Sequence, residues 1–420
     1  MRFKCIAWFI GAVCLLVLSA TSFGFAAVGD WPQWRGPNRD GISTETGLLK
    51  SWPAGGPQLA WKATGLGRGY SSVSIVGNRI FTVGDADDSS AVVALDLAGG
   101  KILWSAKLGK TGGGDGYPGP RSTPTVDGDL VFALGQFGDL VCFESGSGKE
   151  RWRKNLAIYF SGRMMSGWGY SESPLVDGDK MVCTPGGANG TVVALNKNTG
   201  AVVWQAKEMK DAAAYSSVIK ADIGGVPQYI QLTDSSVAGV AANDGRLLWR
   251  GTRRGQVAVV PTPIFYDNQI FVTSGYGVGC NLFKVTPAGG KFSVEEVYHN
   301  RDMVNHHGGV VRVGEHLYGY SDGKGWVCQE FKTGRIVWAE KDKLGKGSLV
   351  AADGHLYLRS ESGKGNVVLI EASPKGYKET GRFPQPDRSQ ANSWAHPVVA
   401  GGKLYLRDQD VLLCYDVKQK

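Results

Sequence analysis

The sequence predicts an all-β protein, an eight-bladed β-propeller of four-stranded blades. Three observations support this prediction: a short pattern ending in tryptophan recurs along the chain, the copies lie about 46 residues apart, and no helical period follows the first residues. Repeats of this size, with short strands and glycine turns, are typical of propeller blades.

Each clear copy of the pattern begins with a small residue and ends ten positions later with tryptophan, and a glycine lies four positions before that tryptophan. The clear copies run from Ala94 to Trp104, Cys142 to Trp152, Ala194 to Trp204 and Cys328 to Trp338, with Gly100, Gly148, Gly200 and Gly334 in the turn. A looser copy runs from Gly239 to Trp249. Aromatic residues at Trp61, Tyr298 and Phe383 extend the series, which predicts that each of them fills a gap between neighbouring sheets.

Strands are predicted within one period at residues 70–76, 79–83, 91–96 and 101–106, all rich in β-branched or aromatic residues. Turn pairs such as Gly77-Asn78 and Asp127-Gly128 join the first two strands of a period. These pairs tolerate positive φ, as two-residue hairpin turns require.

The two ends of the repeat region are predicted to share one blade. The segment from Ala395 to Asp416 supplies only three strands, and the strand around Trp61 has no three strands before it. Pairing of these N- and C-terminal segments closes a ring over residues 59–416 and removes the exposed sheet edges.

The first residues are expected to form a secretory signal peptide, residues 1–26. Arg2 and Lys4 precede an uncharged apolar run at residues 5–18, and Ala26 offers a cleavage site. We therefore expect a periplasmic or secreted chain with no membrane span after cleavage. Residues 27–58 are predicted to be an N-terminal strap whose Trp31 and Trp34 cover a propeller surface, with a partner-docking arm as the alternative.

Five cysteines follow the predicted signal peptide: Cys142, Cys183, Cys280, Cys328 and Cys414. Three of them occupy the small-residue position of the repeat, so we expect buried core thiols there.

The net charge of +8 is spread along the chain without a basic cluster, which argues against nucleic-acid binding. A monomer is expected.

These repeats resemble the Ala-x-Asp-x-x-x-Gly-x-x-x-Trp motif of the pyrroloquinoline-quinone (PQQ)-like repeat propeller family. That family includes quinoprotein alcohol dehydrogenases and the outer-membrane assembly protein BamB. The resemblance covers about residues 59–416 and implies the eight-bladed fold. It also implies PQQ with calcium as the cofactor of a dehydrogenase, or a cell-envelope protein as the partner of an assembly protein. The chain has no pair of adjacent cysteines and no lipoprotein cleavage box, and none of its residues can be matched to the calcium ligands of the dehydrogenases.

The candidate site lies where the first strands of the blades begin, near one mouth of the central channel. Repeat alignment brings the polar and aromatic residues of these segments together; the candidate ligand-binding residues are Arg121, Tyr170, Glu172, Tyr215, His306, His307, Lys346, Trp394 and His396. Arg121 and Lys346 are suited to binding a carboxylate or phosphate, and Glu172 with His306 or His307 is suited to act as a general acid and base pair. The alternative is that these groups pair with one another and that the serines and threonines are wetted channel lining.

Adjacent residues of a regular strand point to opposite faces, so His306 and His307 are not expected to line the channel together. No metal-binding, nucleotide-binding or nucleophile-elbow motif occurs in the sequence.

The resulting hypothesis is an exported, non-catalytic propeller that binds a small ligand or protein partner at one channel mouth. The alternatives are a PQQ-dependent dehydrogenase oxidising alcohols or sugars and, with the least support, a hydrolase or lyase using Glu172 and a histidine.

Overall fold

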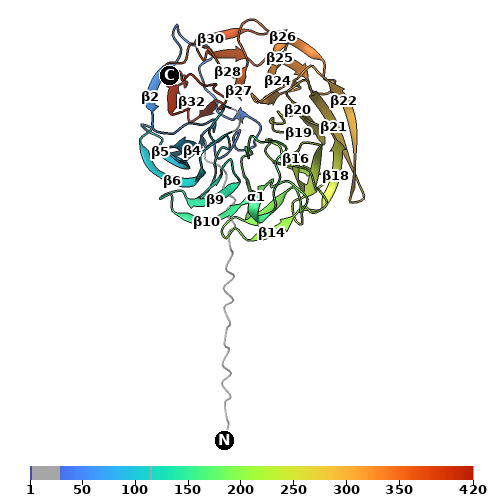
Figure 1. Ribbon diagram of the computed structural model, residues 1–420. Helices are drawn as coiled ribbons and strands as arrows, with labels where there is room; N and C mark the ends of the chain where they lie inside the picture. The colour runs from blue at the N-terminus through green and yellow to red at the C-terminus, as the bar shows by residue number, and fades with distance from the viewer. Residues whose placement is uncertain (2–28, 114–115, 420) are drawn as a thin grey trace.

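The computed structural model describes residues 1, 29–113 and 116–419 and folds them into a ring of eight β-sheets (Figure 1). Residues 2–28, which include all of the predicted signal peptide except Met1, lie outside the described part, as do residues 114–115 and 420. The all-β, eight-bladed prediction is confirmed. The one helix of the described residues is the short α1 (Leu156–Tyr159).

The first four blades follow one another along the chain. Their strands are β3 (Ser74–Val76), β4 (Arg79–Ala86), β5 (Ser89–Asp96) and β6 (Ile102–Lys110); β7 (Thr125–Asp127), β8 (Leu130–Leu134), β9 (Asp139–Glu144) and β10 (Glu150–Asn155); β11 (Leu175–Asp177), β12 (Lys180–Cys183), β13 (Val193–Asn196) and β14 (Val202–Gln205); and β15 (Ile219–Ile223), β16 (Val226–Leu232), β17 (Ser236–Ala241) and β18 (Leu247–Thr252).

The next three blades continue this order. Their strands are β19 (Ile264–Tyr266), β20 (Gln269–Ser274), β21 (Gly279–Ala288) and β22 (Lys291–Asn300); β23 (Val310–Val313), β24 (His316–Ser321), β25 (Gly325–Glu330) and β26 (Ile336–Glu340); and β27 (Gly347–Ala352), β28 (His355–Ser360), β29 (Val367–Glu371) and β30 (Glu379–Phe383).

The last blade joins the two ends of the chain, as the repeat count predicts. Strand β2 (Gln58–Ala63) pairs antiparallel with β33 (Val411–Asp416), which continues through β32 (Lys403–Asp408) to β31 (Val398–Ala400). Trp61 lies opposite Cys414 in this pairing, which is the register that Trp104 and Ala94 have within their own blade. The closed ring therefore uses the same strand pairing at its seam as elsewhere.

The inner strands are shorter than the sequence predicts. β3 begins at Ser74, whereas a strand from Tyr70 is expected. The preceding segments bond to the neighbouring blade: the backbone N–H of Ser72 donates to Thr123 Oγ1 (3.1 Å), that of Thr123 to Ser173 Oγ (2.9 Å) and that of Ser173 to Ser217 Oγ (3.0 Å). These small polar residues are buried and link neighbouring blades.

The repeated tryptophan packs onto the turn glycine of the following blade. A Cβ added to Gly148 would lie 2.6 Å from the Trp104 ring, and Gly148 has φ +71°, so both the close approach and the backbone favour glycine. The Trp104 indole N–H also donates to the carbonyl of Ser145 in that blade (3.1 Å). Trp152 repeats the arrangement with Gly200 and the carbonyl of Lys197 (2.8 Å). The pattern thus ties successive sheets together through packing and a hydrogen bond.

One blade departs from the pattern, and the prediction for Phe383 is wrong in register. Phe383 pairs with Val367, and it is Gly381 that stands opposite Leu369, in the position of the tryptophan. Trp52, from the N-terminal strap, fills that place: its ring lies 2.7–2.8 Å from where a Gly381 Cβ would be. The Trp52 ring centroid is 5.8 Å from that of Tyr357 on β28, close to the 6.0 Å between Trp338 and Tyr318 in the preceding blade.

The strap also adds a fifth strand to this blade, because β1 (Ile42–Ser43) pairs parallel with β27. The N-terminal segment passes near the centre of the ring, in blue in Figure 1. There it bonds to inner segments of different blades: Trp31 pairs with Ile75, and the Arg35 Nη2 donates to the carbonyl of Val310 (2.5 Å). Arg39 donates to the carbonyl of Ser173 (2.7 Å). The strap is therefore part of the core and does not simply cover its surface.

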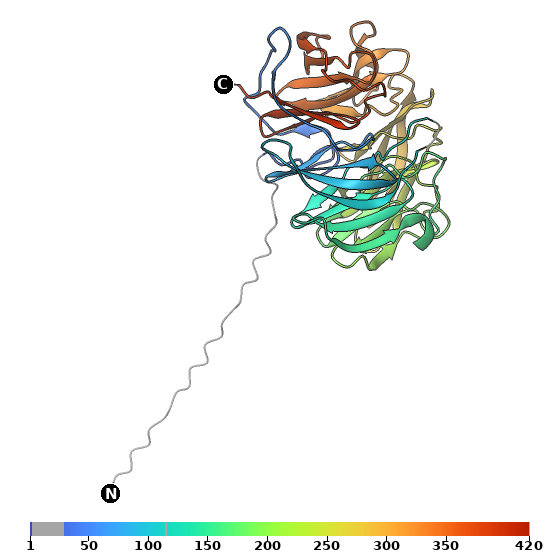
Figure 2. The same ribbon diagram turned by 60° about the vertical axis from the view of Figure 1, so that its left-hand side comes forward.

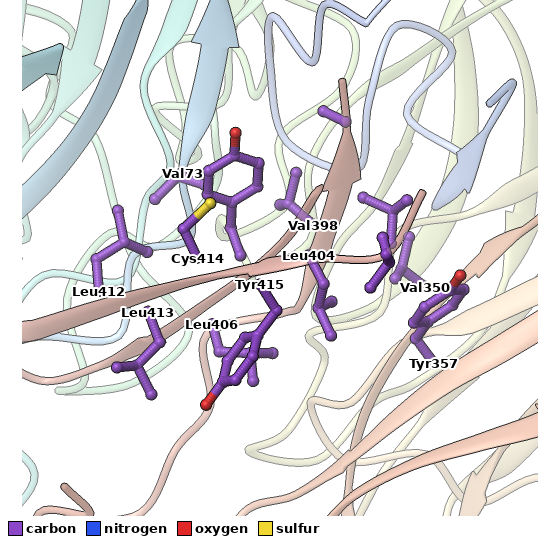
Figure 3. Close-up of a cluster of buried hydrophobic side chains, with 14 of the residues drawn as sticks. Val73, Val350, Tyr357, Val398, Leu404, Leu406, Leu412, Leu413, Cys414 and Tyr415 are labelled. Atoms are coloured by element: carbon purple, nitrogen blue, oxygen red, sulfur yellow. The ribbon is translucent and has the colours of Figure 1, made fainter. Parts of the chain in front are cut away.

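Figure 2 shows the ring of sheets from a second direction. The core consists of apolar clusters between adjacent blades, one of which is drawn in Figure 3. The cluster in Figure 3 brings Tyr357 of one blade against Val398 and Leu404 of the next, with Cys414 among them. All five cysteines of the repeat region are free and buried, which confirms the expectation of core thiols. Burial raises the pKa of the Cys414 thiol to about 12, so the thiol is uncharged at neutral pH.

Candidate functional site

A cavity of about 200 Å³ opens where the inner segments of the blades meet. Its lining is dominated by aromatic rings, with one arginine, three histidines and a few serines: Trp34, Tyr70, Tyr117, Arg121, Trp168, Ser171, Ser173, Tyr215, Ser217, Val257, Ala258, Val260, Tyr276, His306, His307, Trp394 and His396. Trp34 comes from the strap, and its indole N–H donates to Thr262 Oγ1 (2.9 Å). Because the strap crosses the centre of the ring at this point, it closes the cavity on one side.

Aromatic rings stack along one wall of the cavity. The Trp394 ring lies between those of Tyr70 and Tyr117, at centroid distances of 4.5 and 4.9 Å, and is tilted by 31° to each. Tyr117 also contacts Trp168 at 5.8 Å. Contacts of this kind hold large apolar faces in fixed positions, so the wall is preformed.

Arg121 lies against this wall without a carboxylate partner. Its guanidinium carbon is 5.4 Å from the centre of the Tyr70 ring and 5.6 Å from that of Trp168. It donates to the carbonyls of Gly119 (3.2 Å) and Tyr117 (2.8 Å) and forms no ion pair with any described residue. Burial lowers the pKa of Arg121, although arginine remains charged at neutral pH. The cavity therefore contains a positive charge that forms no ion pair with a described side chain.

His306 and His307 both line the cavity, so the expectation that they face opposite sides is wrong. The reason is local: they lie in an irregular bend before β23, not in a strand. The Lys346 ammonium donates to His306 Nδ1 (2.8 Å) and pairs with Asp322 (2.8 Å). Burial, together with the charges of His307 and Lys346, lowers the pKa of His306 to about 4, so this imidazole is neutral at pH 7.

Glu361, which the sequence did not single out, orients His307. Its carboxylate lies 2.6 Å from His307 Nε2 and accepts a hydrogen bond from the Trp394 indole (3.1 Å). Burial raises the pKa of Glu361, but the hydrogen bond from His307 and the nearby cations lower it more, and the net shift is downward. Glu361 follows the end of β28, at the mouth side of its blade. No strand-start alignment would have found it.

Six of the nine predicted site residues share the cavity: Arg121, Tyr215, His306, His307, Trp394 and His396. The ring of His396 lies 4.5 Å from Trp34, and its Nε2 is bonded to the carbonyl of His307 (2.9 Å). Burial and the charge of Arg35 lower the pKa of His396 to about 3.

The other three predicted residues lie behind the cavity wall or beside it. The Tyr170 hydroxyl donates to the carbonyl of Pro185 (3.0 Å), and Lys346 is held by Asp322 and His306. Glu172 is buried, accepts hydrogen bonds from the backbone N–H of Thr184 and from Gln231, and contacts no cavity histidine. Among the described residues, the geometry therefore does not assemble the acid–base pair of Glu172 and a histidine. The cavity residues that the sequence analysis missed, Trp34, Tyr117, Trp168 and Tyr276, lie on the strap and on loops.

Glu172 is expected to make stability depend on pH. Burial raises its pKa from 4.5 to about 7, despite the opposing hydrogen bonds from Thr184. Between these values the unfolded chain releases the proton and the folded protein keeps it, so its stability falls as the pH rises through this window. Urea unfolding of Glu172→Gln and wild type should show a stability difference that changes by about 3 kcal/mol across it.

The exposed Glu295, changed to Gln, provides the control and should show no such pH-dependent difference. If the stability difference between Glu172→Gln and wild type is the same at both ends of the window, Glu172 is ionised in the folded protein throughout and this assignment is wrong.

The cavity lining does not suit PQQ with calcium. Calcium takes six to eight oxygen ligands, with carboxylates prominent among them. Within the described ranges, no carboxylate lines the cavity, and no group of three or more histidine, cysteine, aspartate or glutamate residues is arranged to hold a metal. We therefore derive no reaction step through this cofactor.

Comparison with known proteins gives a consistent family match. A family model described as outer membrane protein assembly factor BamB matches residues 88–340, more than half of the chain. The BamB protein of Shewanella oneidensis is 24% identical over 264 residues, and that of Alkalilimnicola ehrlichii is 25% identical over 215. The matched regions cover 57% and 50% of this chain, and 61% and 50% of those relatives. The chain thus matches well under two thirds of the length of these relatives.

Solved structures share the fold at low sequence identity. BamB from Moraxella catarrhalis superposes with a TM-score of 0.56 at 16% identity, covering 83% of this chain and 95% of that one. Quinohemoprotein alcohol dehydrogenase from Comamonas testosteroni superposes with a TM-score of 0.64 at 11% identity, covering 93% and 81%. At such identities these likenesses establish the propeller architecture alone.

Proposed function

The chain belongs to the family described as outer membrane protein assembly factor BamB, and from this premise we propose that it is an exported, non-catalytic binding propeller of the cell envelope. The cavity at the channel mouth is its binding site, and a small ligand is its occupant. The observation that carries this proposal is the Arg121 guanidinium inside an aromatic cavity, where it forms no ion pair with a described residue. Burying a charge without a partner is costly, and an anionic ligand would remove that cost.

Three further features support binding over catalysis. The aromatic wall is fixed by ring contacts, and the polar groups at its edge are held by side chains that do not themselves enter the cavity. Tyr117, Val257 and Tyr276 are exposed at the mouth and give a partner protein an apolar surface on the same face. None of the cavity-lining groups is a nucleophile activated by an adjacent base.

Location in the cell envelope rests on the predicted signal peptide and on the names of the relatives. In the described part of the chain, no helix is both long and apolar enough to cross a membrane. Fractionation of cells that produce the full chain should place it outside the cytoplasm. Recovery only in the cytoplasmic fraction would contradict export.

The binding proposal is tested by thermal unfolding of the purified protein against a panel of sugars, carboxylic acids, and PQQ with calcium. A ligand at about 100 times its Kd stabilises the folded state by about 2.7 kcal/mol. We expect at least one sugar or carboxylic acid to raise the Tm of wild type and of Arg68→Ala, an exposed arginine near the same mouth, but much less that of Arg121→Ala. If no compound raises the Tm, or if Arg121→Ala responds as wild type does, the proposed site is wrong. Reduction of an artificial electron acceptor by alcohols after addition of PQQ and calcium would overturn the non-catalytic assignment.

A further inference from the structure

We infer that the cavity receives a sugar ring that carries a carboxylate, a sugar acid of the hexuronate class. This inference rests on the proposed function and specifies its ligand. The charge, the hydrogen-bonding groups, the aromatic surfaces and the size of the cavity all suit such a ligand.

The charge of the cavity selects an anion. Arg121 is the one arginine among the described lining residues, which include no lysine and no carboxylate, and the lining histidines His306 and His396 are neutral. Two of the five N–H groups of Arg121 are used on carbonyls, which leaves three for a ligand. A guanidinium binds a carboxylate through paired hydrogen bonds, which gives both affinity and orientation.

His306 and His307 each present one ring nitrogen to the cavity, and that of His306 is a donor. Lys346 can only donate, so His306 Nδ1 accepts its hydrogen bond and the proton of this neutral ring lies on Nε2. The Glu361 carboxylate can only accept, so His307 Nε2 carries a proton toward it and Nδ1 is the ring nitrogen left for a ligand. Neither His306 Nε2 nor His307 Nδ1 is hydrogen-bonded to another described residue.

Hydroxyl groups both donate and accept, so a hydroxylated ring pairs with both ring nitrogens, whereas an aromatic acid without hydroxyls leaves them unpaired. Sites built to bond a hydroxyl discriminate strongly against analogues that lack it. Serines in the lining, Ser171 and Ser217, extend the same mixed character.

The aromatic rings provide surfaces for the C–H faces of such a ring. Trp394, Tyr70 and Tyr117 form one wall, and Trp34 closes the cavity from the strap. The volume of about 200 Å³ is below the range of roughly 300–1,000 Å³ that is usual for drug-sized ligands. It therefore suits a ligand of the size of a single sugar ring.

The test measures binding by tryptophan fluorescence, since Trp34, Trp168 and Trp394 all line the cavity. The probes are glucuronate, glucose and benzoate, which separate the contributions of charge and hydroxyls. We expect glucuronate to bind wild type at least tenfold more tightly than either of the other probes. Arg121→Met should bind glucuronate at least tenfold more weakly, and Arg68→Met, the matched control, should bind it as wild type does. Digalacturonate in a parallel titration distinguishes the end of an acidic polysaccharide from a free sugar acid.

Each contrary outcome separates this inference from the proposed function. Equal affinities for glucose and glucuronate, or tighter binding of benzoate, would overturn the sugar-acid assignment while leaving a binding cavity in place. Glucuronate binding that is unchanged in Arg121→Met would overturn the role of Arg121 in this assignment. If neither these probes nor any compound of the wider panel binds, both the inference and the proposed function fail.

Discussion

Replacing Arg407 with methionine is expected to lower the free energy of unfolding by about 3–5 kcal/mol, because several buried carbonyls lose their donor at about 1–3 kcal/mol each. Arg407 lies on β32 in the last blade and is fully buried. Its guanidinium donates to the carbonyls of Ser71 (3.1 Å) and Val83 (2.6 Å), which belong to the first blade and the segment before it. It therefore ties the last blade to the first, and methionine retains only the apolar stem.

Chemical denaturation of Arg407→Met measures this loss. The control is Arg335→Met, since the Arg335 side chain is 79% exposed, and surface substitutions of this kind change stability by no more than about 0.5 kcal/mol. Equal stability of the two variants would mean that the buried guanidinium contributes nothing to closure of the ring.

Replacing Trp52 with alanine is expected to cost about 3–5 kcal/mol, the usual range for removing a buried tryptophan from a core. Trp52 is 8% exposed and packs against Tyr357 and Phe383 at 5.8 and 5.3 Å. It occupies the place that a strand tryptophan takes in other blades, above Gly381. Its loss should open a cavity in the blade and loosen the strap.

A second substitution makes this prediction specific. Gly381→Trp alone should be destabilising, because its side chain would collide with that of Trp52. In the double variant with Trp52→Ala, the new tryptophan should recover part of the lost stability by restoring the arrangement of the other blades. If the destabilising effects of Trp52→Ala and Gly381→Trp simply add in the double variant, then Trp52 does not take the place of a strand tryptophan at position 381.

The sequence predicted the ring and its seam because both depend on a local, repeated register. Trp104 and Ala94 are strand partners whose spacing is visible in the chain, and Trp61 could be matched to Cys414 by the same rule. Phe383 was misread because the true tryptophan position is a glycine. The residue that compensates, Trp52, lies more than 300 positions away, and no local spacing encodes that contact.

The candidate site was predictable only in part, for a related reason. Repeat alignment located the inner segments, and six of nine predicted residues share the cavity. It did not resolve which way a side chain turns. Glu172 points between blades because its segment hydrogen-bonds to the neighbouring blade. His306 and His307 face one cavity because their segment bends. Tyr117, Trp168 and Glu361 lie in loops or beyond strand ends, where the repeat imposes no register.

A crystal structure of the protein soaked with glucuronate, at a concentration that saturates the fluorescence signal, tests the central claim most directly. We predict that one sugar ring lies against Trp394, with its carboxylate on the Arg121 guanidinium and its hydroxyls toward His306 and His307. Glucuronate at any other place, with water alone beside Arg121, would contradict the account.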